Sequence, residues 1–152
     1  MALLRRKGEG TATWKTASPK ENAPDKNAMK VLQDFIPGAQ ANLCFGGELR
    51  YCPDFPDLSK AKGVSVLRSG LHLGTVKGKV FVPDHAWAVC NQPPNVPRVE
   101  LNEEQARLYQ NGQVVPAEGK GWMLACFAGI PLGWGKVSDG MMKNHYPKGL
   151  RR

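Results

Sequence analysis

The sequence predicts a mixed α+β fold divided into two small domains, and three observations carry this prediction. The chain has 152 residues, which is enough for one ordinary domain or two small ones. Its 17 glycines and 12 prolines favour short elements joined by turns over long helices. Helix-like and strand-like hydrophobic patterns both occur, and the three prolines within residues 92–97 mark a boundary between two halves.

The first 27 residues are expected to be a short strand followed by a linker. Residues 2–7 (ALLRRK) have the apolar start of a strand and a basic tip. Residues 8–27 are dominated by Gly, Thr, Ser, Pro, Lys, Glu and Asn, which is typical of a linker.

Residues 28–91 are predicted to form a small α+β domain. Apolar residues from Ala28 to Phe35 recur on one face of a helix that Pro37-Gly38 ends. A turn-rich stretch at residues 52–57 interrupts the strands that follow. Asp84 is expected to cap a second short helix. Strands are expected at residues 48–51, 64–67, 71–76 and 79–82, the last two joined by a tight turn.

Residues 98–152 are predicted to form a second, mostly β domain. A strand at residues 99–101 precedes a helix that Asn102 caps and Gly112 stops. After Gln113 the apolar segments are short and lie between glycine-containing turns, one of them predicted at residues 133–135. This spacing suggests a small β-barrel.

The chain is basic, with 21 lysines and arginines, 13 aspartates and glutamates and a formal net charge of +8. This balance favours an anionic partner, with nucleic acid first and an acidic membrane surface second. The alternative on charge alone is an ordinary soluble domain that is incidentally basic. The excess is uneven, because residues 120–152 contain six basic residues and one acidic residue.

Several classes are disfavoured by what the sequence lacks. No run approaches the roughly 18–20 apolar residues of a membrane-spanning helix, and the start has no apolar signal-peptide region, so we expect a cytoplasmic protein without a membrane partner. The four cysteines form no CxxC motif and the three histidines are scattered. We therefore expect reduced, partly buried cysteines and no metal site. No GxSxG or HExxH motif occurs, which disfavours a stand-alone enzyme.

Two C-terminal segments have the composition of a nucleic-acid site. Residues 143–151 (KNHYPKGLR) interleave cations for phosphates with rings for unpaired bases, which suits single-stranded or looped RNA better than duplex DNA. The alternative is a solvated basic tail with Tyr146 packed inward. Residues 133–136 (GWGK) place two glycines around a bulky residue, which permits close approach of a phosphate. A glycine-kinked barrel strand explains that segment equally well.

These segments resemble a known family. Residues 131–136 (PLGWGK) and 141–151 (MMKNHYPKGLR) closely resemble the C-terminal end of RsmF-like RNA cytosine-5 methyltransferases of the Sun family. The resemblance implies a PUA-like, mostly β pseudo-barrel that binds RNA at residues 98–152. Residues 66–74 and 81–86 are similar to the family's small intermediate domain, here residues 28–91. Residues 2–7 are similar to the last strand of its catalytic domain.

The resemblance also implies that catalysis belongs to another domain. Family members methylate RNA with a Rossmann-type domain that binds S-adenosylmethionine and uses paired cysteines in Pro-Cys and Thr-Cys-Ser contexts. Here Cys52 precedes a proline, and no Thr-Cys-Ser occurs. We therefore expect no catalytic residues and no cofactor in this chain, with S-adenosylmethionine bound by the absent catalytic domain. The expected partners are that domain and an RNA, by resemblance ribosomal RNA carrying the target for 5-methylcytosine.

The predicted role is RNA binding and substrate positioning. The lysines and Arg151 would contact phosphates, while Tyr146 or His145 would stack or form hydrogen bonds. The two glycines would let the RNA backbone approach, and Asn144 would contact a base edge or cap a turn. The alternative function is a protein-interaction module in which residues 28–91 dock on a catalytic or ribosomal partner. The predicted RNA-binding residues are Gly133, Trp134, Gly135, Lys136, Lys143, Asn144, His145, Tyr146, Lys148 and Arg151.

Overall fold

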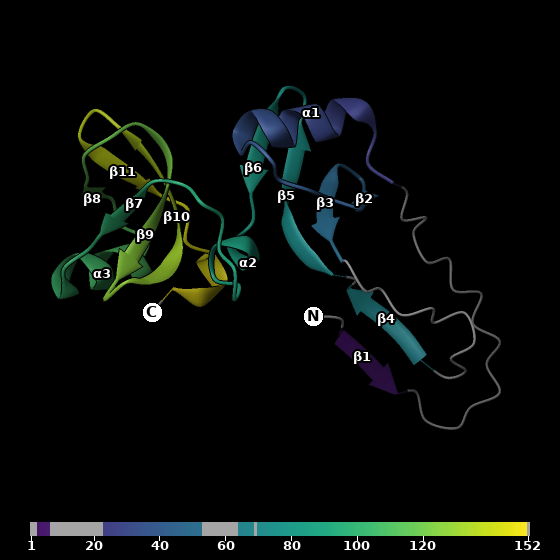
Figure 1. Ribbon diagram of the computed structural model, residues 1–152. Helices are drawn as coiled ribbons and strands as arrows, with labels where there is room; N and C mark the ends of the chain where they lie inside the picture. The colour runs from purple at the N-terminus through teal and green to yellow at the C-terminus, as the bar shows by residue number, and fades with distance from the viewer. Residues whose placement is uncertain (1–2, 7–22, 53–63, 69, 152) are drawn as a thin grey trace. The chain divides into compact units, whose positions relative to one another are not determined.

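The computed structural model describes residues 3–6, 23–52, 64–68 and 70–151, whose contacts divide the chain into two compact units (Figure 1). Unit 1 is Met1–Val82 and unit 2 is Pro83–Arg152. Both units contain helices and strands, which confirms the predicted α+β class. The predicted linker at residues 8–27 lies outside the described residues as far as residue 22, and its last two residues, Lys26 and Asn27, begin a helix. The predicted turn-rich stretch at residues 52–57 lies outside the described residues except for Cys52.

Unit 1 contains one long helix, a four-stranded sheet and a separate strand pair. The helix α1 is Lys26–Phe35. The strands are β1 (Leu3–Arg6), β2 (Leu43–Phe45), β3 (Glu48–Tyr51), β4 (Val64–Arg68), β5 (Leu71–Lys77) and β6 (Val80–Pro83). The four-stranded sheet has the order β2-β3-β5-β6, and β1 pairs with β4.

The helix α1 forms because the sequence supplies both its start signal and its apolar face. The Asp25 carboxylate accepts a hydrogen bond of 2.6 Å from the Ala28 N–H, which satisfies one donor that a helix N-terminus leaves open. On the apolar face, Leu32 is fully buried. The Phe35 ring lies 5.0 Å, centroid to centroid, from that of Phe81 in β6. The predicted helix is confirmed, and these contacts pack it on the sheet.

Two short strands of unit 1 compare differently with the sequence prediction. The strand β2 was not predicted, because three residues are too few to show a period-two pattern; it pairs antiparallel with β3 across the Gly46-Gly47 turn. The strand predicted at residues 2–7 is present as β1, which pairs antiparallel with β4, with Leu4 opposite Val66.

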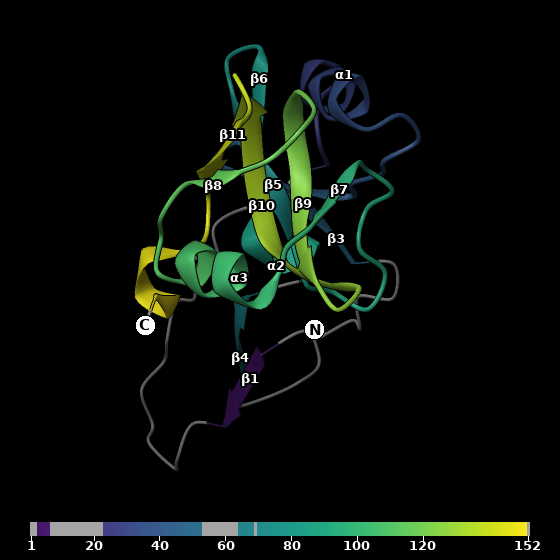
Figure 2. The ribbon, with the colours of Figure 1, turned by 90° about the vertical axis from the view of Figure 1, so that its left-hand side faces the viewer.

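Unit 2 is built on one five-stranded sheet (Figure 2). Its order is β7-β9-β10-β11-β8, in which β7 is parallel to β9 and the other neighbours are antiparallel. Figure 2 shows the long strands β9 and β10 side by side, with α3 near one end of the sheet. The elements are α2 (His85–Ala88), β7 (Arg98–Glu100), α3 (Glu103–Gln110), β8 (Val115–Pro116), β9 (Gly121–Phe127), β10 (Ile130–Ser138), β11 (Met141–Asn144) and the 3-10 helix Lys148–Leu150.

The helix α3 is defined by its capping residues, as predicted. The Asn102 side chain accepts a hydrogen bond of 2.8 Å from the Gln105 N–H, and the Gln105 side chain accepts one of 3.0 Å from the Asn102 N–H. This reciprocal capping box satisfies two open donors at the helix start. After the helix ends at Gln110, Gly112 adopts a left-handed φ of +85°.

The core of unit 2 lies between α3 and one face of the sheet. Because α3 contributes Tyr109, which is fully buried, the helix is fixed against the strands. The pseudo-barrel character predicted for this half agrees with the curled sheet that the core fills. The buried residues of this core are Leu101, Ala106, Tyr109, Val115, Ala117, Met123, Ala125, Val137 and Met142.

Two features of unit 2 differ from what the sequence predicted. The turn predicted at residues 133–135 does not exist, because β10 runs without interruption through that segment with only an irregularity between Pro131 and Gly133. The short helix α2 groups by its contacts with unit 2, whereas the predicted intermediate domain included it. The predicted domain boundaries at residues 91 and 98 stay a prediction.

Candidate nucleic-acid interface

Three strands of unit 2 place one aromatic and two basic side chains in a single row. Lys136 in β10 lies opposite Trp122 in β9 on one side and opposite Lys143 in β11 on the other. Side chains of directly opposed residues in antiparallel strands share one face of the sheet. We call these three residues, together with His145, the aromatic–basic row.

The row lies on the face of the sheet turned away from the α3 core. Met123, Val137 and Met142, which are next to the row residues along the same strands, are buried in that core. Because successive strand residues point to opposite faces, the row residues must project the other way. The two lysines are exposed and the Trp122 indole is half-buried. The Lys136 Nζ lies 6.0 Å from the centroid of the Trp122 ring, a cation–π arrangement.

The row is confined to one end of this face because α2 covers the next position. Trp134, two residues before Lys136 in β10, is only 1% exposed. Its ring lies 6.0 Å from that of Trp87 in α2. Its Nε1 donates a hydrogen bond of 2.9 Å to the Asp84 carbonyl oxygen at the start of α2. The part of this face under α2 is therefore apolar and buried. The part that carries the row is polar and exposed to solvent.

His145 continues the row beyond the end of β11. Its backbone N–H donates to the Trp134 carbonyl oxygen at 3.2 Å, so the strand pairing extends to it. Its exposed ring lies 4.4 Å, centroid to centroid, from the Trp122 ring, with an interplanar angle of 56°. Partial burial and the charge of Lys136 lower the pKa of His145 below its ordinary value of 6.5. The imidazole is therefore neutral at pH 7.

The chain adds two more exposed cations after the row. Lys148 begins the 3-10 helix, and Arg151 follows it. The Arg151 guanidinium donates a hydrogen bond of 3.2 Å to the Tyr146 carbonyl oxygen and packs over Gly112, so its position is defined. These predicted phosphate-binding residues are both accessible in unit 2.

Three predicted RNA contacts, Gly133, Trp134 and Gly135, are placed in the interior instead. Trp134 is buried and hydrogen-bonded within the protein, so it cannot stack on RNA in this conformation. A Cβ at Gly133 would lie 2.6 Å from the Tyr109 hydroxyl oxygen, and one at Gly135 would overlap the Met142 side chain. The two glycines are thus required by internal packing, and the glycine-kinked strand is the correct interpretation of this segment.

Asn144 and Tyr146 also have structural partners. The Asn144 amide donates to the Tyr109 carbonyl oxygen at 2.6 Å and to the Gln113 carbonyl oxygen at 3.1 Å. Its side-chain oxygen accepts from the Tyr146 N–H at 2.8 Å. Of the two predicted roles for Asn144, the structure supports the turn cap. The half-buried Tyr146 ring packs edge-on against His85 and Tyr109, with centroids 5.3 Å and 5.6 Å away.

The sequence prediction omitted Trp122 from the site. Trp122 precedes the basic C-terminal string by about twenty positions, and only the strand register brings it beside Lys136. The apolar sequence of β9 gives no alternation signal, because Leu124 and Cys126, on the same face as Trp122, are buried as fully as Met123 and Ala125.

Three other titratable groups of unit 2 are shifted toward their neutral forms. Burial, opposed by the nearby Asp84 carboxylate, lowers the pKa of His85 below 6.5. Burial raises the pKa of Tyr109 well above 10, and its hydroxyl donates a hydrogen bond of 2.8 Å to the Trp134 carbonyl oxygen. Burial also raises the pKa of the Cys126 thiol. These groups are packed in the protein, and none has the activating partners of a nucleophile.

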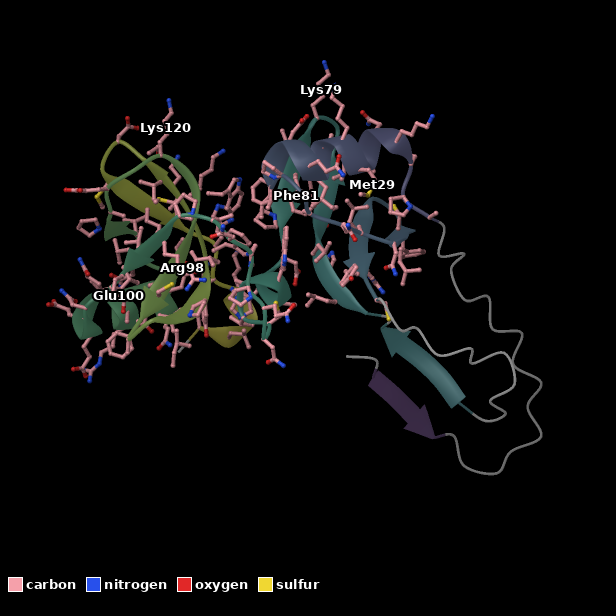
Figure 3. The ribbon with its side chains drawn as sticks, viewed as in Figure 1. Met29, Lys79, Phe81, Arg98, Glu100 and Lys120 are labelled. Atoms are coloured by element: carbon pink, nitrogen blue, oxygen red, sulfur yellow. The ribbon has the colours of Figure 1, made fainter. Side chains whose placement is uncertain are left out.

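The described part of the chain offers no metal site or membrane span. Among these residues no group of three or more His, Cys, Asp or Glu side chains could hold a metal ion. None of the described helices is long and apolar enough to cross a membrane. An open cavity of about 430 Å³ lies between β7, α3 and β8 and includes Arg98 and Glu100 (Figure 3). Its mixed charge does not match a phosphate chain.

Comparison with known families gives two matches that together span most of the sequence. Residues 21–90 match the model described as the RsmF rRNA methyltransferase first C-terminal domain. Residues 96–152 match the model described as the methyltransferase RsmF PUA domain. This range contains every residue of the aromatic–basic row, whereas α2 lies before it. No curated protein sequence matches the chain.

Proposed function

Since the chain carries the two C-terminal domains of the RsmF-like rRNA methyltransferases, we propose that it binds ribosomal RNA and positions it for methylation of a cytosine at carbon 5. Methyl transfer and S-adenosylmethionine binding are assigned to a separate catalytic domain. The described residues do not fit that cofactor, because β7 leads into α3 through Leu101 and Asn102 without the glycine-rich turn of a Rossmann site. We accordingly assign this chain no catalytic residue.

The observation that carries this proposal is the aromatic–basic row. Two lysines on adjacent strands, Lys136 and Lys143, share an exposed face with two accessible rings. Cations at this spacing match the phosphates of a nucleic-acid backbone, and accessible rings match unpaired bases. Lys148 and Arg151 add two further exposed cations to unit 2. If the basic charge were incidental, there would be no reason for the aromatic rings and the lysines to lie on the same face of the sheet.

The proposal is tested by titrating the protein with a ribosomal RNA fragment at several salt concentrations. Each phosphate contact contributes about one unit to the slope of log K against log salt. Replacing Lys136 and Lys143 by methionine should therefore flatten the slope by about two units and weaken binding.

The matched control is the double replacement of Lys77 and Lys79 by methionine in unit 1. Both lysines are exposed, and Lys79 extends away from its hairpin (Figure 3). This variant loses the same net charge without touching the row. If it weakens RNA binding as much as the row variant does, net charge and not the row accounts for the affinity. Equal affinity of the wild-type protein for duplex DNA of the same length would remove the RNA-specific part of the proposal.

A second candidate function is protein docking through unit 1. It is favoured by the edge strand β2, where Phe45 is 38% exposed opposite Glu48 in β3. Edge strands with exposed rings are common docking surfaces. Binding to a purified RsmF-type catalytic domain, unaffected by nuclease and lost on replacing Phe45 by serine, would support this candidate.

A further inference from the structure

The rings of unit 2 form a series that leads from the core to the surface. Trp134 contacts Trp87 in the interior and lies 6.3 Å, edge to face at 89°, from Trp122. Trp122 in turn lies 4.4 Å from His145, which is exposed. Each ring packs against the one behind it, and this packing restricts the rotation of the outermost pair. Fixed rings lose little conformational entropy on binding.

Resting on the function proposed above, we propose that the Trp122–His145 pair is a stacking platform for an unpaired base of single-stranded RNA, with the flanking phosphates bound by Lys136 and Lys143. The base would add to the ring series at its exposed end. The two lysines lie directly opposite each other on the adjacent strands, next to that end. The platform therefore selects RNA whose bases are available, not a paired helix.

The charge state of the platform supports stacking by a base. Partial burial and Lys136 keep the His145 imidazole neutral at pH 7 by lowering its pKa. A neutral ring stacks on the π-face of any base, which makes this contact tolerant of sequence. The positive charge needed for the phosphates comes from the lysines, so His145 can stack on a base without carrying charge.

Unpaired bases are required because a duplex hides the ring faces of its bases. Within an A-form helix the bases stack on one another and present only their edges and backbone. A protein that recognised duplex RNA through this surface would use the lysines alone. Binding through the platform predicts that the bases contribute to the affinity. Binding through the lysines alone predicts that they do not.

The experiment compares three ligands of equal length with the full chain: an oligouridylate, an abasic ribose-phosphate chain and a duplex RNA. Wild-type protein should bind the oligouridylate about 5- to 150-fold more tightly than the abasic chain, which has the same phosphates. His145→Ala should bring this ratio close to one while leaving the salt dependence unchanged. The lysine variants should weaken both single-stranded ligands equally and keep the ratio.

His145→Ala changes an exposed side chain and should leave the fold intact. Trp122→Leu is a second variant, and its folding is checked by circular dichroism. The platform is overturned if the wild-type ratio is one, if the ratio survives in His145→Ala, or if the duplex binds more tightly than the oligouridylate. If the lysine variants bind every ligand as wild type does, the proposed function fails. If they weaken binding but the bases contribute nothing, the platform alone fails.

Discussion

The Trp134 indole nitrogen donates a hydrogen bond to the Asp84 carbonyl oxygen, fifty positions earlier in the chain. This bond ties the middle of β10 to the start of α2. The same Asp84 caps α2 through its carboxylate, which accepts from the Ala86 N–H at 2.8 Å. One residue thus starts a helix with its side chain and anchors it to the sheet with its backbone.

Replacing Trp134 by phenylalanine should lower the free energy of unfolding by about 2 kcal/mol, because the buried hydrogen bond and part of the packing against Trp87 are lost. Urea denaturation measures the change. Ile130→Val is the matched control in the same strand, since Ile130 is 66% exposed, and it should change stability by about 0.5 kcal/mol or less. Equal losses in both variants would contradict the structural role given to Trp134.

Replacing Gly133 by alanine should destabilise the protein by about 1–3 kcal/mol, because the new Cβ would displace the buried Tyr109 hydroxyl. Thermal unfolding measures this loss. Gly149→Ala is the control, since no atom lies within 4 Å of a Cβ there. Adding Tyr109→Phe to Gly133→Ala should recover part of the loss by removing the colliding oxygen. Failure of this rescue would show that the strain lies elsewhere.

Replacing Lys136 by methionine should raise the pKa of His145, because the nearby positive charge opposes protonation of the imidazole. An NMR titration of the His145 ring protons reports this pKa directly. Lys120→Met removes an exposed lysine that is not among the groups shifting the pKa of His145, and it should leave that pKa unchanged. A pKa that does not move in Lys136→Met would mean that burial alone sets it.

The stability of the protein should fall as the pH drops below about 6.5. The pKa of His85 is lower in the folded chain than in the unfolded chain, so between these values the unfolded chain binds more protons. Stability from this histidine is complete above 6.5 and is lost as pH falls toward the folded pKa. Chemical denaturation between about pH 7.5 and pH 5.5 covers this window before most carboxylates titrate.

His85→Phe should reduce that loss. The His85 Nδ1 is buried without a hydrogen-bond partner, so a phenyl ring sacrifices no bond there and keeps the edge contact with Tyr146. His145 has a lowered pKa as well and should leave a residual dependence of the same sign. If His85→Phe loses as much stability on acidification as wild type, His85 is not the group responsible.

Elements with local signals were predicted correctly from the sequence. The start of α3 was predicted at Asn102, whose side chain accepts from the Gln105 N–H. The first helix was predicted from Ala28, and it begins two residues earlier, at Lys26, behind an Asp25 cap that was not predicted. The exposed cations of the site were predicted for a similar reason, since lysines are costly to bury and Lys136 and Lys143 are exposed.

The rest depended on residues far apart in the sequence. Gly133 and Gly135 suggested a turn, yet both are required where Tyr109 and Met142 leave no room for a side chain. Trp134 was predicted to contact RNA because the local sequence does not show that α2 packs over its ring. Trp122 was missed because pairing between β9 and β10 makes it a neighbour of Lys136. Local patterns contain none of these contacts.

The register between β10 and β11 has a consequence for how this surface could change in evolution. A slip of β11 by one residue would bring Met142 opposite Lys136 on the open face and drive Lys143 into the apolar interior. Inserting or deleting one residue at the Asp139-Gly140 turn would therefore damage the fold and the binding surface together. Point substitutions can retune the charges of the row singly, but small length changes in this hairpin should be purged by selection for folding.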